Sequence, residues 1–317
     1  MSQERFKLES IEIKEEHKNK ETEVIVKPFN IDDFNLLISD NAQGKTRFLR
    51  TLYFLSSLVS NRPRIIITLF SGKFTFIHET EKNKRIVYLI DIIPENGKNK
   101  YEEEIICDNK KIFSTKEKIL INEKTNCKVE SFFIPPNIPA ISSINEPDYI
   151  TINLINEFFS KIVYISSSKS REIIVSSPNA IIPNSEGTNI ADVLFNWSKE
   201  FSDIYNETLN EFYKCFNLIE NVDFVENVIS GIKTKTLAFK EKSISKLIDQ
   251  VNWSDGIYRI LHLLMSVKVP FKKNQILIPP SLILIDEIEN GLDFKRLEFI
   301  VNYLRGRGVI FSSHNPL

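Results

Sequence analysis

The stretch SLILIDEIENGLD, residues 281–293, decides the fold of this chain. Residues 282–285 form an apolar run that predicts a buried strand, and this run ends in two adjacent acids, Asp286 and Glu287. A carboxylate at the end of a buried strand can hold Mg²⁺, and a second one can act as a general base that polarises an attacking water. The alternative is an exposed acidic pair that merely follows a core strand. We expect the catalytic arrangement.

A second stretch, SDNAQGKT, spans residues 39–46 and follows a short apolar run at residues 34–38. Apolar residues at helical spacing come after it, so the expected order is strand, loop and helix. In a phosphate-binding loop of that order, backbone N–H groups cradle a phosphate, Lys45 reaches the β- and γ-phosphates, and Thr46 ligates Mg²⁺. Ser39 stands where the pattern has Gly. The alternative is a Gly-Lys-Thr turn before a surface helix.

The stretch VIFSSHNP, residues 309–316, ends another buried strand in His314. A histidine at that position can hydrogen-bond a γ-phosphate and report whether the phosphate is present. A lone histidine is more often only structural. The position of His314, one strand and one helix after the acidic pair, favours the functional interpretation.

The stretch WSDGIYRILHLL, residues 253–264, places Ser254, Asp255 and Gly256 at the start of an expected helix. Glycine permits a close backbone approach, and the N–H groups of a helix N-terminus favour a phosphate. Taken alone, the stretch is better explained as an ordinary capped helix, because Ser-Asp is a common N-terminal signal. Its weight comes from its order among the other three stretches.

Composition limits the class of protein. The chain has 317 residues, of which 42% are hydrophobic and 26% charged, as in ordinary soluble globular proteins. Lys+Arg 41 against Asp+Glu 42 leaves a formal charge of -1, so no overall basic character indicates nucleic acid. Its three cysteines share no metal-like spacing, which favours a reducing, cytoplasmic setting. No apolar run reaches the roughly 18 residues of a membrane helix, so we expect no membrane association.

The remaining segments predict a mixture of strands and helices. Short β-rich runs separated by turn residues predict an antiparallel meander at residues 65–113. Helical patterns predict helices at residues 149–161 and 190–216, with a strand, KIVYIS, between them. A strand that ends at His314 would leave a sheet edge in need of cover, so we expect the last part of the fold to be incomplete at its C-terminus.

In this order, the four stretches resemble those of ABC-type ATPase heads of the SMC/RecF/OLD group, and the stand-alone bacterial AAA-labelled ATPases still more closely. WSDGIYRILHLLMSV resembles the signature helix of that group, SLILIDEIENGLD its Walker B segment and D-loop, and SSHNP its switch histidine. NIADVLFNW, preceded by Glu186 and Gly187, and YISSSKSRE, which contains Arg171, resemble further segments of the group. The resemblance covers nearly the whole chain.

The resemblance implies an α/β fold: a P-loop ABC-ATPase head with a mixed central sheet, an antiparallel β subdomain and an inserted helical lobe. Residues 1–145 would form the N-terminal part of the nucleotide-binding lobe with the meander. Residues 146–250 would form the helical insert lobe. Residues 251–317 would carry the signature helix, the Walker B segment and the switch histidine.

The resemblance also implies the residues of the site. Glu287 and His314 would be catalytic, and Thr46 and Asp286 would be the metal ligands. The Q-loop glutamine has no convincing position among Gln3, Gln43, Gln250 and Gln275. The residues expected to bind the cofactor are Asn41, Gly44, Lys45, Thr46, Arg47, Ser254 and Gly256.

We therefore expect an ATP- and Mg²⁺-dependent ATPase whose two copies form a homodimer around two ATP molecules. The resemblance implies that it signals to an effector protein such as a nuclease, in antiphage defence or DNA maintenance, and leaves open whether DNA binds. The alternative is a nucleotide-dependent clamp or sensor module that binds DNA or protein with negligible turnover. Glu287 argues against a clamp, because a clamp needs no general base. A phosphotransferase would need an acceptor site, and none is evident.

Overall fold

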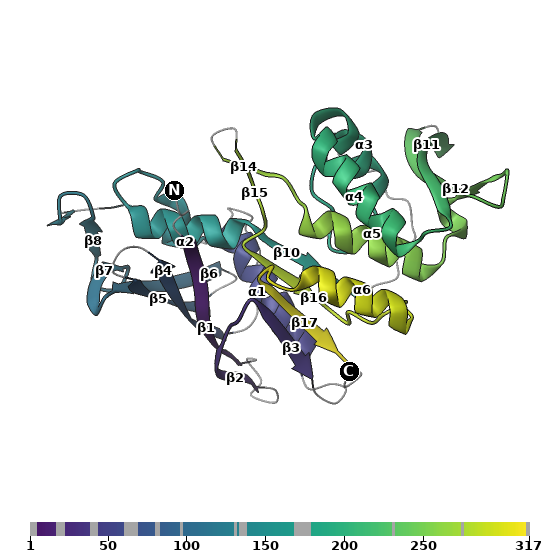
Figure 1. Ribbon diagram of the computed structural model, residues 1–317. Coiled ribbons are helices and arrows are strands. Elements are labelled where there is room, and N and C mark those ends of the chain that lie inside the picture. Colours follow the sequence, from purple (N-terminus) through teal and green to yellow (C-terminus); the bar gives the residue numbers. More distant parts are fainter. Residues whose placement is uncertain are drawn as a thin grey trace. The chain divides into compact units, whose positions relative to one another are not determined.

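The computed structural model describes residues 5–16, 23–38, 44–59, 69–79, 83–95, 98–129, 132, 138–167, 179–229, 232–273 and 276–314 (Figure 1). The chain divides into two compact units. Unit 1 comprises Met1–Asp32 and Arg50–Ser160, and unit 2 comprises Asp33–Leu49 and Lys161–Leu317. The expected division into residues 1–145, 146–250 and 251–317 stays a prediction.

Unit 2 is built on a four-stranded sheet in the order β10-β16-β17-β3, and all of its neighbouring strands pair in parallel. Every residue of β10, β16 and β17 is buried, as the unbroken apolar runs of a sheet covered on both faces require. The parallel arrangement brings the carboxyl ends of the strands to one edge of the sheet. The strands span Phe34–Ile38 (β3), Ile162–Ile165 (β10), Leu282–Ile285 (β16) and Val309–Ser313 (β17).

The expectation that the strand ending at His314 forms a sheet edge is wrong. β17 lies between β16 and β3, with Ile310 paired to both Leu284 and Asn35. Among the described strands, the edges of this sheet are β10 and β3. Local sequence does not reveal this, because the place of a strand in a parallel sheet is set by the crossover that precedes it.

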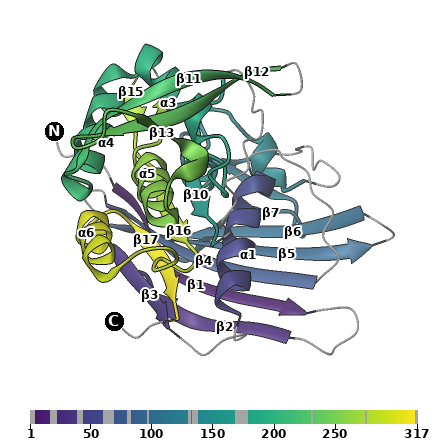
Figure 2. The same cartoon turned by 90° about the vertical axis from the view of Figure 1, so that its right-hand side faces the viewer.

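Helices of unit 2 cover the sheet and build the core. Figure 2 shows α5 and α6 on the same side of β16 and β17, and their apolar side chains share one buried cluster with β10, β16, β17 and α3. The α/β class is thus confirmed. The helices span Lys45–Val59 (α1, whose first residues belong to unit 2), Ile190–Glu200 (α3), Ser202–Cys215 (α4), Asp255–Val267 (α5) and Phe294–Leu304 (α6).

The segment expected as one helix at residues 190–216 contains two helices. It breaks at Phe201, whose backbone (φ -138, ψ 54) is not helical and whose side chain is buried. Asn189 occupies the N-cap position of α3, but its side-chain amide donates to the Ile182 carbonyl and makes no cap hydrogen bond. Burial of the Phe201 ring accompanies the change in direction between the two helices.

Unit 2 also contains strands and a short helix that the sequence patterns did not predict. A three-stranded antiparallel sheet has the order β11-β12-β13, and β14 pairs with β15. The bounds are Ile219–Ile229 (β11), Ile232–Glu241 (β12), Leu247–Asp249 (β13), Gln250–Asn252 (η2, a 3₁₀ helix), Phe271–Lys273 (β14) and Ile276–Ile278 (β15).

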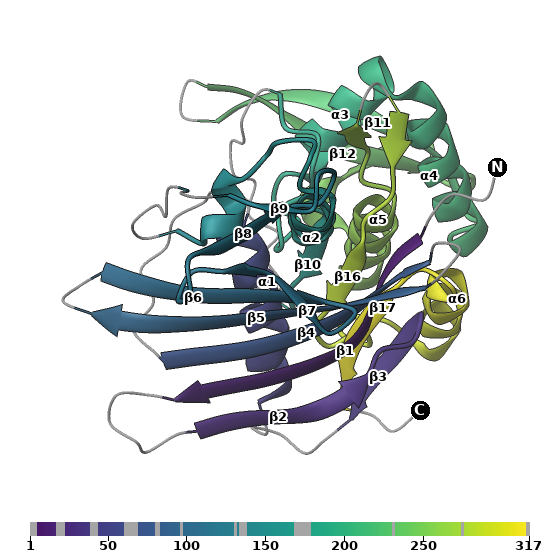
Figure 3. The ribbon, with the colours of Figure 1, turned by 90° about the vertical axis from the view of Figure 1, so that its left-hand side faces the viewer.

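Unit 1 is an eight-stranded antiparallel sheet in the order β2-β1-β4-β5-β6-β7-β8-β9, and Figure 3 shows β2, β1, β4, β5 and β6 side by side. The expected meander is confirmed from β4 to β7; residues 65–68 lie outside the described part of the chain. The bounds are Arg5–Glu16 (β1), Glu23–Asn30 (β2), Leu69–Glu79 (β4), Lys84–Glu95 (β5), Lys98–Cys107 (β6), Lys110–Ser114 (β7), Ile119–Asn122 (β8) and Cys127–Lys128 (β9).

One face of the unit 1 sheet packs against α2 (Ile150–Ser160) through aromatic rings. Phe158 meets Phe76 at a centroid distance of 5.2 Å, and Phe159 meets Phe74 at 5.3 Å, both edge to face. A 3₁₀ helix, η1 (Ala140–Ser143), precedes α2. Alternating residues of β4 and β5 supply the buried face, as the period of a half-buried strand requires.

Among the described residues, no helix is long and apolar enough to cross a membrane.

Candidate nucleotide site

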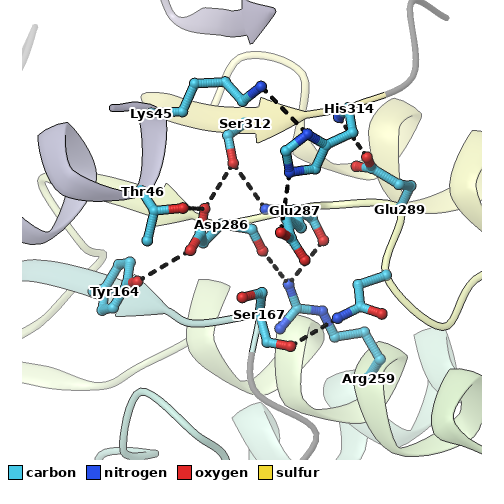
Figure 4. A network of polar contacts seen from close by, with 11 residues as sticks. Lys45, Thr46, Tyr164, Ser167, Arg259, Asp286, Glu287, Glu289, Ser312 and His314 are labelled. Carbon is cyan, nitrogen blue, oxygen red and sulfur yellow. Dashed lines mark hydrogen bonds and ion pairs between the residues drawn. The ribbon is translucent and has the colours of Figure 1, made fainter. Parts of the chain in front are cut away.

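The carboxyl edge of the parallel sheet in unit 2 gathers side chains that are far apart in sequence (Figure 4). Thr46 begins the helix that follows β3, Asp286 follows β16, and His314 follows β17. Because β16, β17 and β3 are neighbours, these positions meet at one edge. In open α/β sheets, this edge is where ligands bind.

Asp286 is the buried centre of the site, with no exposed surface. Its Oδ1 accepts hydrogen bonds from Thr46 Oγ1 at 2.9 Å and from Ser312 Oγ at 2.8 Å. The hydroxyl of Tyr164 lies 3.5 Å from Oδ2, at the limit of a hydrogen bond. A buried carboxylate is costly unless hydrogen bonds replace its water, and these hydroxyls do so.

Glu287 has an unusual backbone. Its φ is 48°, in the left-handed region that few residues other than glycine adopt. Such a conformation costs on the order of 1–3 kcal/mol and persists only where neighbouring groups hold it. One of these groups is Ser312, whose Oγ accepts the Glu287 N–H at 2.8 Å while it donates to Asp286. A single hydroxyl therefore fixes both acids of the Walker B-like segment.

His314 connects Glu287 to Lys45. Its Nε2 lies 3.0 Å from Glu287 Oε1, its Nδ1 lies 3.4 Å from Lys45 Nζ, and its N–H donates to Glu289 Oε1 at 2.6 Å. An ammonium has no lone pair to accept a hydrogen bond, so in the neutral ring Nδ1 accepts from Lys45 and Nε2–H donates to Glu287. The side chains expected to contact the phosphate and to activate water thus form one chain of contacts.

The residues present fit a Mg–nucleotide complex. Thr46 and Asp286 offer two hard oxygen ligands side by side, and Mg²⁺ in nucleotide sites takes few protein ligands and completes its shell with phosphates and waters. Among the described residues there is no cluster of three His, Cys, Asp or Glu that could hold a metal ion by itself. The first turn of α1, which would face the phosphates, carries no acid.

Not all of the expected loop can be placed. Residues 39–43, including Asn41, lie outside the described part of the chain, as does Arg171. Gly44 has a φ of 87°, and its carbonyl accepts the Phe48 N–H at 2.8 Å at the start of α1. Arg47 lies half-buried in the first turn of the same helix. The roles assigned to these residues stay predictions.

Ser254 and Gly256 lie at the N-terminus of α5. Ser254 is the N-cap, and its Oγ accepts the Ile257 N–H at 3.3 Å. A Cβ on Gly256 would lie 2.7 Å from the Gly291 carbonyl oxygen, and one on Gly291 would lie 3.0 Å from Asp255 Cβ. The close approach that a glycine permits at 256 is therefore made within the chain, to the D-loop-like turn. Contact of these residues with the nucleotide of a second copy stays a prediction.

Comparisons with known proteins give distant structural likenesses. No protein-family model and no curated protein matches the chain. Two solved structures of the recombination mediator protein RecF of the RecFOR pathway are similar to it. The one with ATPrS is 10% identical, covers 98% of this chain and 93% of its own, and has a TM-score of 0.43. The one with ATP is 13% identical, covers 98% and 94%, and has a TM-score of 0.42. Because a fold does not determine a function, the function of this chain follows from the residues of its own site.

The sequence patterns missed several residues that complete the site, above all Arg259. This arginine is 8% exposed and donates to the main-chain carbonyls of Ser166, Asp286 and Glu287. Burial lowers the pKa of its guanidinium to about 10, and the nearby carboxylates of Asp286 and Glu287 oppose that shift. It stays charged at neutral pH. The sequence feature that could have indicated this residue is a charged side chain inside the otherwise apolar run GIYRILHLL.

His262, one turn further along α5, is structural. It is 2% exposed, its Nε2 lies 3.0 Å from the Asn184 carbonyl, and burial lowers its pKa to about 3, so the ring is neutral. A Cβ on Gly187 would lie 2.8 Å from His262 Nδ1, and the Tyr258 hydroxyl donates to the Gly187 carbonyl. These contacts explain the glycine that precedes NIADVLFNW.

Gln250 is also structural. It is 3% exposed, and its Oε1 accepts the Leu237 N–H of β12 at 3.1 Å. The other three glutamines lie outside the described residues, so the Q-loop residue remains unassigned.

Proposed function

We propose that this protein binds Mg-ATP at the edge of the parallel sheet and hydrolyses it. The observation that carries the proposal is the contact of Thr46 with Asp286 beside a Glu287–His314–Lys45 chain. These residues come from three separate stretches, and each has the chemistry that one part of the reaction needs. An ordinary acidic turn would not assemble a lysine, a hydroxyl, two carboxylates and an imidazole around one point.

Each side chain has a distinct role in this proposal. Lys45 and the N–H groups at the start of α1 bind the phosphates, and Thr46 and Asp286 hold Mg²⁺. The bound ion supplies neutralisation of phosphate charge. Glu287 accepts a proton from the attacking water, and His314 orients the Glu287 carboxylate through Nε2–H.

The proposal extends to two copies of the chain. Ser254 and Gly256 at the N-terminus of α5 would contact the ATP held by a second copy, because the N–H groups of a helix N-terminus attract a phosphate. ATP would then join the copies, and hydrolysis would release them. Signalling to an effector such as a nuclease, in antiphage defence or DNA maintenance, is the proposed use of this cycle. It is supported by the sequence resemblance alone.

The test compares Glu287→Gln with wild type in single-turnover hydrolysis and in equilibrium binding of Mg-ATP. Loss of the general base should lower the hydrolysis rate by about 10²–10⁴-fold and leave the Kd for Mg-ATP within a few-fold, because the phosphate ligands are intact. Glu298→Gln is the matched control, since Glu298 is exposed on α6. Tight binding with a slow rate that Glu287→Gln does not change would identify a nucleotide clamp. Absence of Mg-ATP binding would remove the proposal altogether.

A further inference from the structure

Arg259 makes an unusual set of contacts for a buried charge. Its Nη2 donates to the carbonyl oxygens of Asp286 at 2.8 Å and Glu287 at 3.3 Å (Figure 4). Its Nη1 donates to the Ser166 carbonyl. Among the described residues, every hydrogen bond of this guanidinium goes to the main chain. The hydrogen bonds of Arg259 therefore fix the path of the backbone, whereas its interaction with the carboxylates of Asp286 and Glu287 is through charge alone.

The three carbonyls belong to the ends of two neighbouring strands. Ser166 follows β10, and Asp286 and Glu287 follow β16. A guanidinium presents its N–H groups in a planar fork, so one side chain can hold both strand ends at a fixed separation. An ammonium is a single point of charge and cannot span them in the same way.

The main chain that accepts hydrogen bonds from Arg259 includes the strained backbone of Glu287. Glu287 has its φ at 48°, and a left-handed glutamate needs neighbours that prevent relaxation. Ser312 holds the N–H of Glu287 and Arg259 holds its carbonyl, so hydrogen bonds restrain both sides of the residue.

The same helix touches the far end of this segment. The Gly256 and Gly291 backbones are in close contact. Separately from the helix, the Asn290 side chain donates to the carbonyl of Ser167, which follows β10, at 2.7 Å. Helix α5 thus contacts the segment from Asp286 to Gly291 at both ends, through Arg259 and through its first turn.

We propose that Arg259 is a positioning residue that holds the backbone of Glu287 in its left-handed conformation and links it to the first turn of α5. Through this link, the seating of the helix N-terminus controls the placement of the base. The catalytic consequence rests on the proposed ATPase function, whereas the backbone restraint does not.

The restraint is tested without nucleotide, by hydrogen exchange of the full chain. Arg259→Met removes the fork and keeps an unbranched apolar stem, and Arg259→Lys keeps the charge. Met265→Ala is the control for a general loss of packing, because Met265 is fully buried on the same helix and shares its apolar cluster with Ile288. Both Arg259 variants should exchange faster than wild type within residues 286–292, with Lys less affected than Met. Met265→Ala should speed exchange in that segment less than either Arg259 variant does, because it leaves the hydrogen bonds to Asp286 and Glu287 in place.

The catalytic link is tested by kinetics. Arg259→Met should lower kcat on the order of 10²-fold and leave KM and the Kd for Mg-ATP within about threefold, because the base is misplaced while the phosphate ligands remain. Arg259→Lys should recover part of the rate. The double variant with Glu287→Gln should be no slower than Glu287→Gln alone, since Arg259 acts through that residue.

The outcomes separate the two proposals. Faster exchange at residues 286–292 in a chain that hydrolyses no ATP would uphold the restraint and reject the ATPase function. Exchange equal to that of Met265→Ala, a loss confined to KM, or rates that multiply in the double variant would overturn the role of Arg259.

Discussion

Glu103 is a buried acid in unit 1 with hydrogen-bond donors on both oxygens. It is 2% exposed on β6, Tyr88 donates to Oε1 at 2.8 Å, and the Ala140 N–H donates to Oε2. Burial raises the pKa of its carboxyl to about 7, and these hydrogen bonds only partly oppose the shift. Since an unfolded glutamate has a pKa of about 4.3, the folded chain binds a proton that the unfolded chain has lost between these values.

The raised pKa of Glu103 in the folded state determines whether the free energy of unfolding rises or falls with pH. The contribution of Glu103 to the free energy of unfolding should be fully present below about pH 4.3 and lost as the pH rises through about 7. The amide in Glu103→Gln is neutral at every pH, so this variant should lack this slope of the free energy of unfolding against pH. Urea unfolding at pH 5.5 and pH 8 should show wild type losing about 1–3 kcal/mol relative to the variant. Equal slopes for the two proteins would contradict the prediction.

Glu104→Gln is the control for that measurement. Glu104 follows Glu103 on β6, but it lies partly in water and pairs with Lys111 at 2.8 Å. The comparison of Glu104→Gln with wild type should not reproduce the slope, because no buried carboxyl is removed.

Individual residues differ in how well sequence predicts their place. Lys45, Thr46 and Asp286 lie in stretches whose order and spacing bear on their chemistry, and the structure brings them to one edge of the sheet. Glu103 had no such signal, and Arg259 had only that of a charge inside an apolar run, because what matters for each is the burial and the hydrogen-bond partners that the tertiary fold provides. Ser312 lies within a recognised motif, yet its double hydrogen bond depends on the neighbouring strand.

At the scale of elements, the packing of α5 on the turn after β16 depends on Gly256 and Gly291. Gly291 has a φ of 77°, and a Cβ there would lie 3.0 Å from Asp255 Cβ. Gly306 has a φ of 76° with nothing within 4 Å of its Cβ position. Both glycines have a left-handed backbone, but a Cβ would be crowded at Gly291 and free at Gly306. Gly306 therefore provides a matched reference for Gly291.

Gly291→Ala should destabilise the chain more than Gly306→Ala. Each substitution costs about 1–2 kcal/mol for the left-handed backbone, and only Gly291→Ala must also displace the first turn of α5. Thermal unfolding of both variants under the same conditions gives the difference directly. Equal melting temperatures would mean that the first turn of α5 can move away from residue 291 without a loss of stability.

Elements were predictable where one period dominates. The apolar run of β16 and the alternation of β4 and β5 match their burial. The long helical pattern at residues 190–216 concealed the break at Phe201, because the apolar spacing continues across it. β11 and β12 were not recognised, since their lysines and glutamates obscure the alternation of a strand.

At the scale of the whole molecule, the proposed ATP sandwich predicts a change in mass. Glu287→Gln should run as one chain without nucleotide and as two chains with Mg-ATP in light scattering on a sizing column, because the bound ATP is not consumed. Ser254→Asp in the same background should stay at the mass of one chain. Aspartate keeps the N-cap of α5 but places a negative charge toward the phosphate.

Melting temperature serves as the control for Ser254→Asp. A value near that of the parent would show that the cap is retained, so that loss of the dimer reports repulsion alone. Dimerisation that survives this substitution would reject the contact of α5 with a second nucleotide.

The antiparallel meander and the α/β class were predictable from sequence at this scale. The interior position of β17 was not, because strand order follows from crossovers that no local pattern records.

The hydrogen bond between Thr46 and Asp286 has a consequence for the uptake of the ion. An octahedral ion with oxygen ligands at 2.0–2.1 Å requires about 2.9 Å between adjacent ligands, which is the separation of Thr46 Oγ1 and Asp286 Oδ1. Mg²⁺ would therefore replace the hydrogen bond between the two oxygens by coordination to both of them. The start of α1 and the end of β16 would keep their present separation when the ion binds.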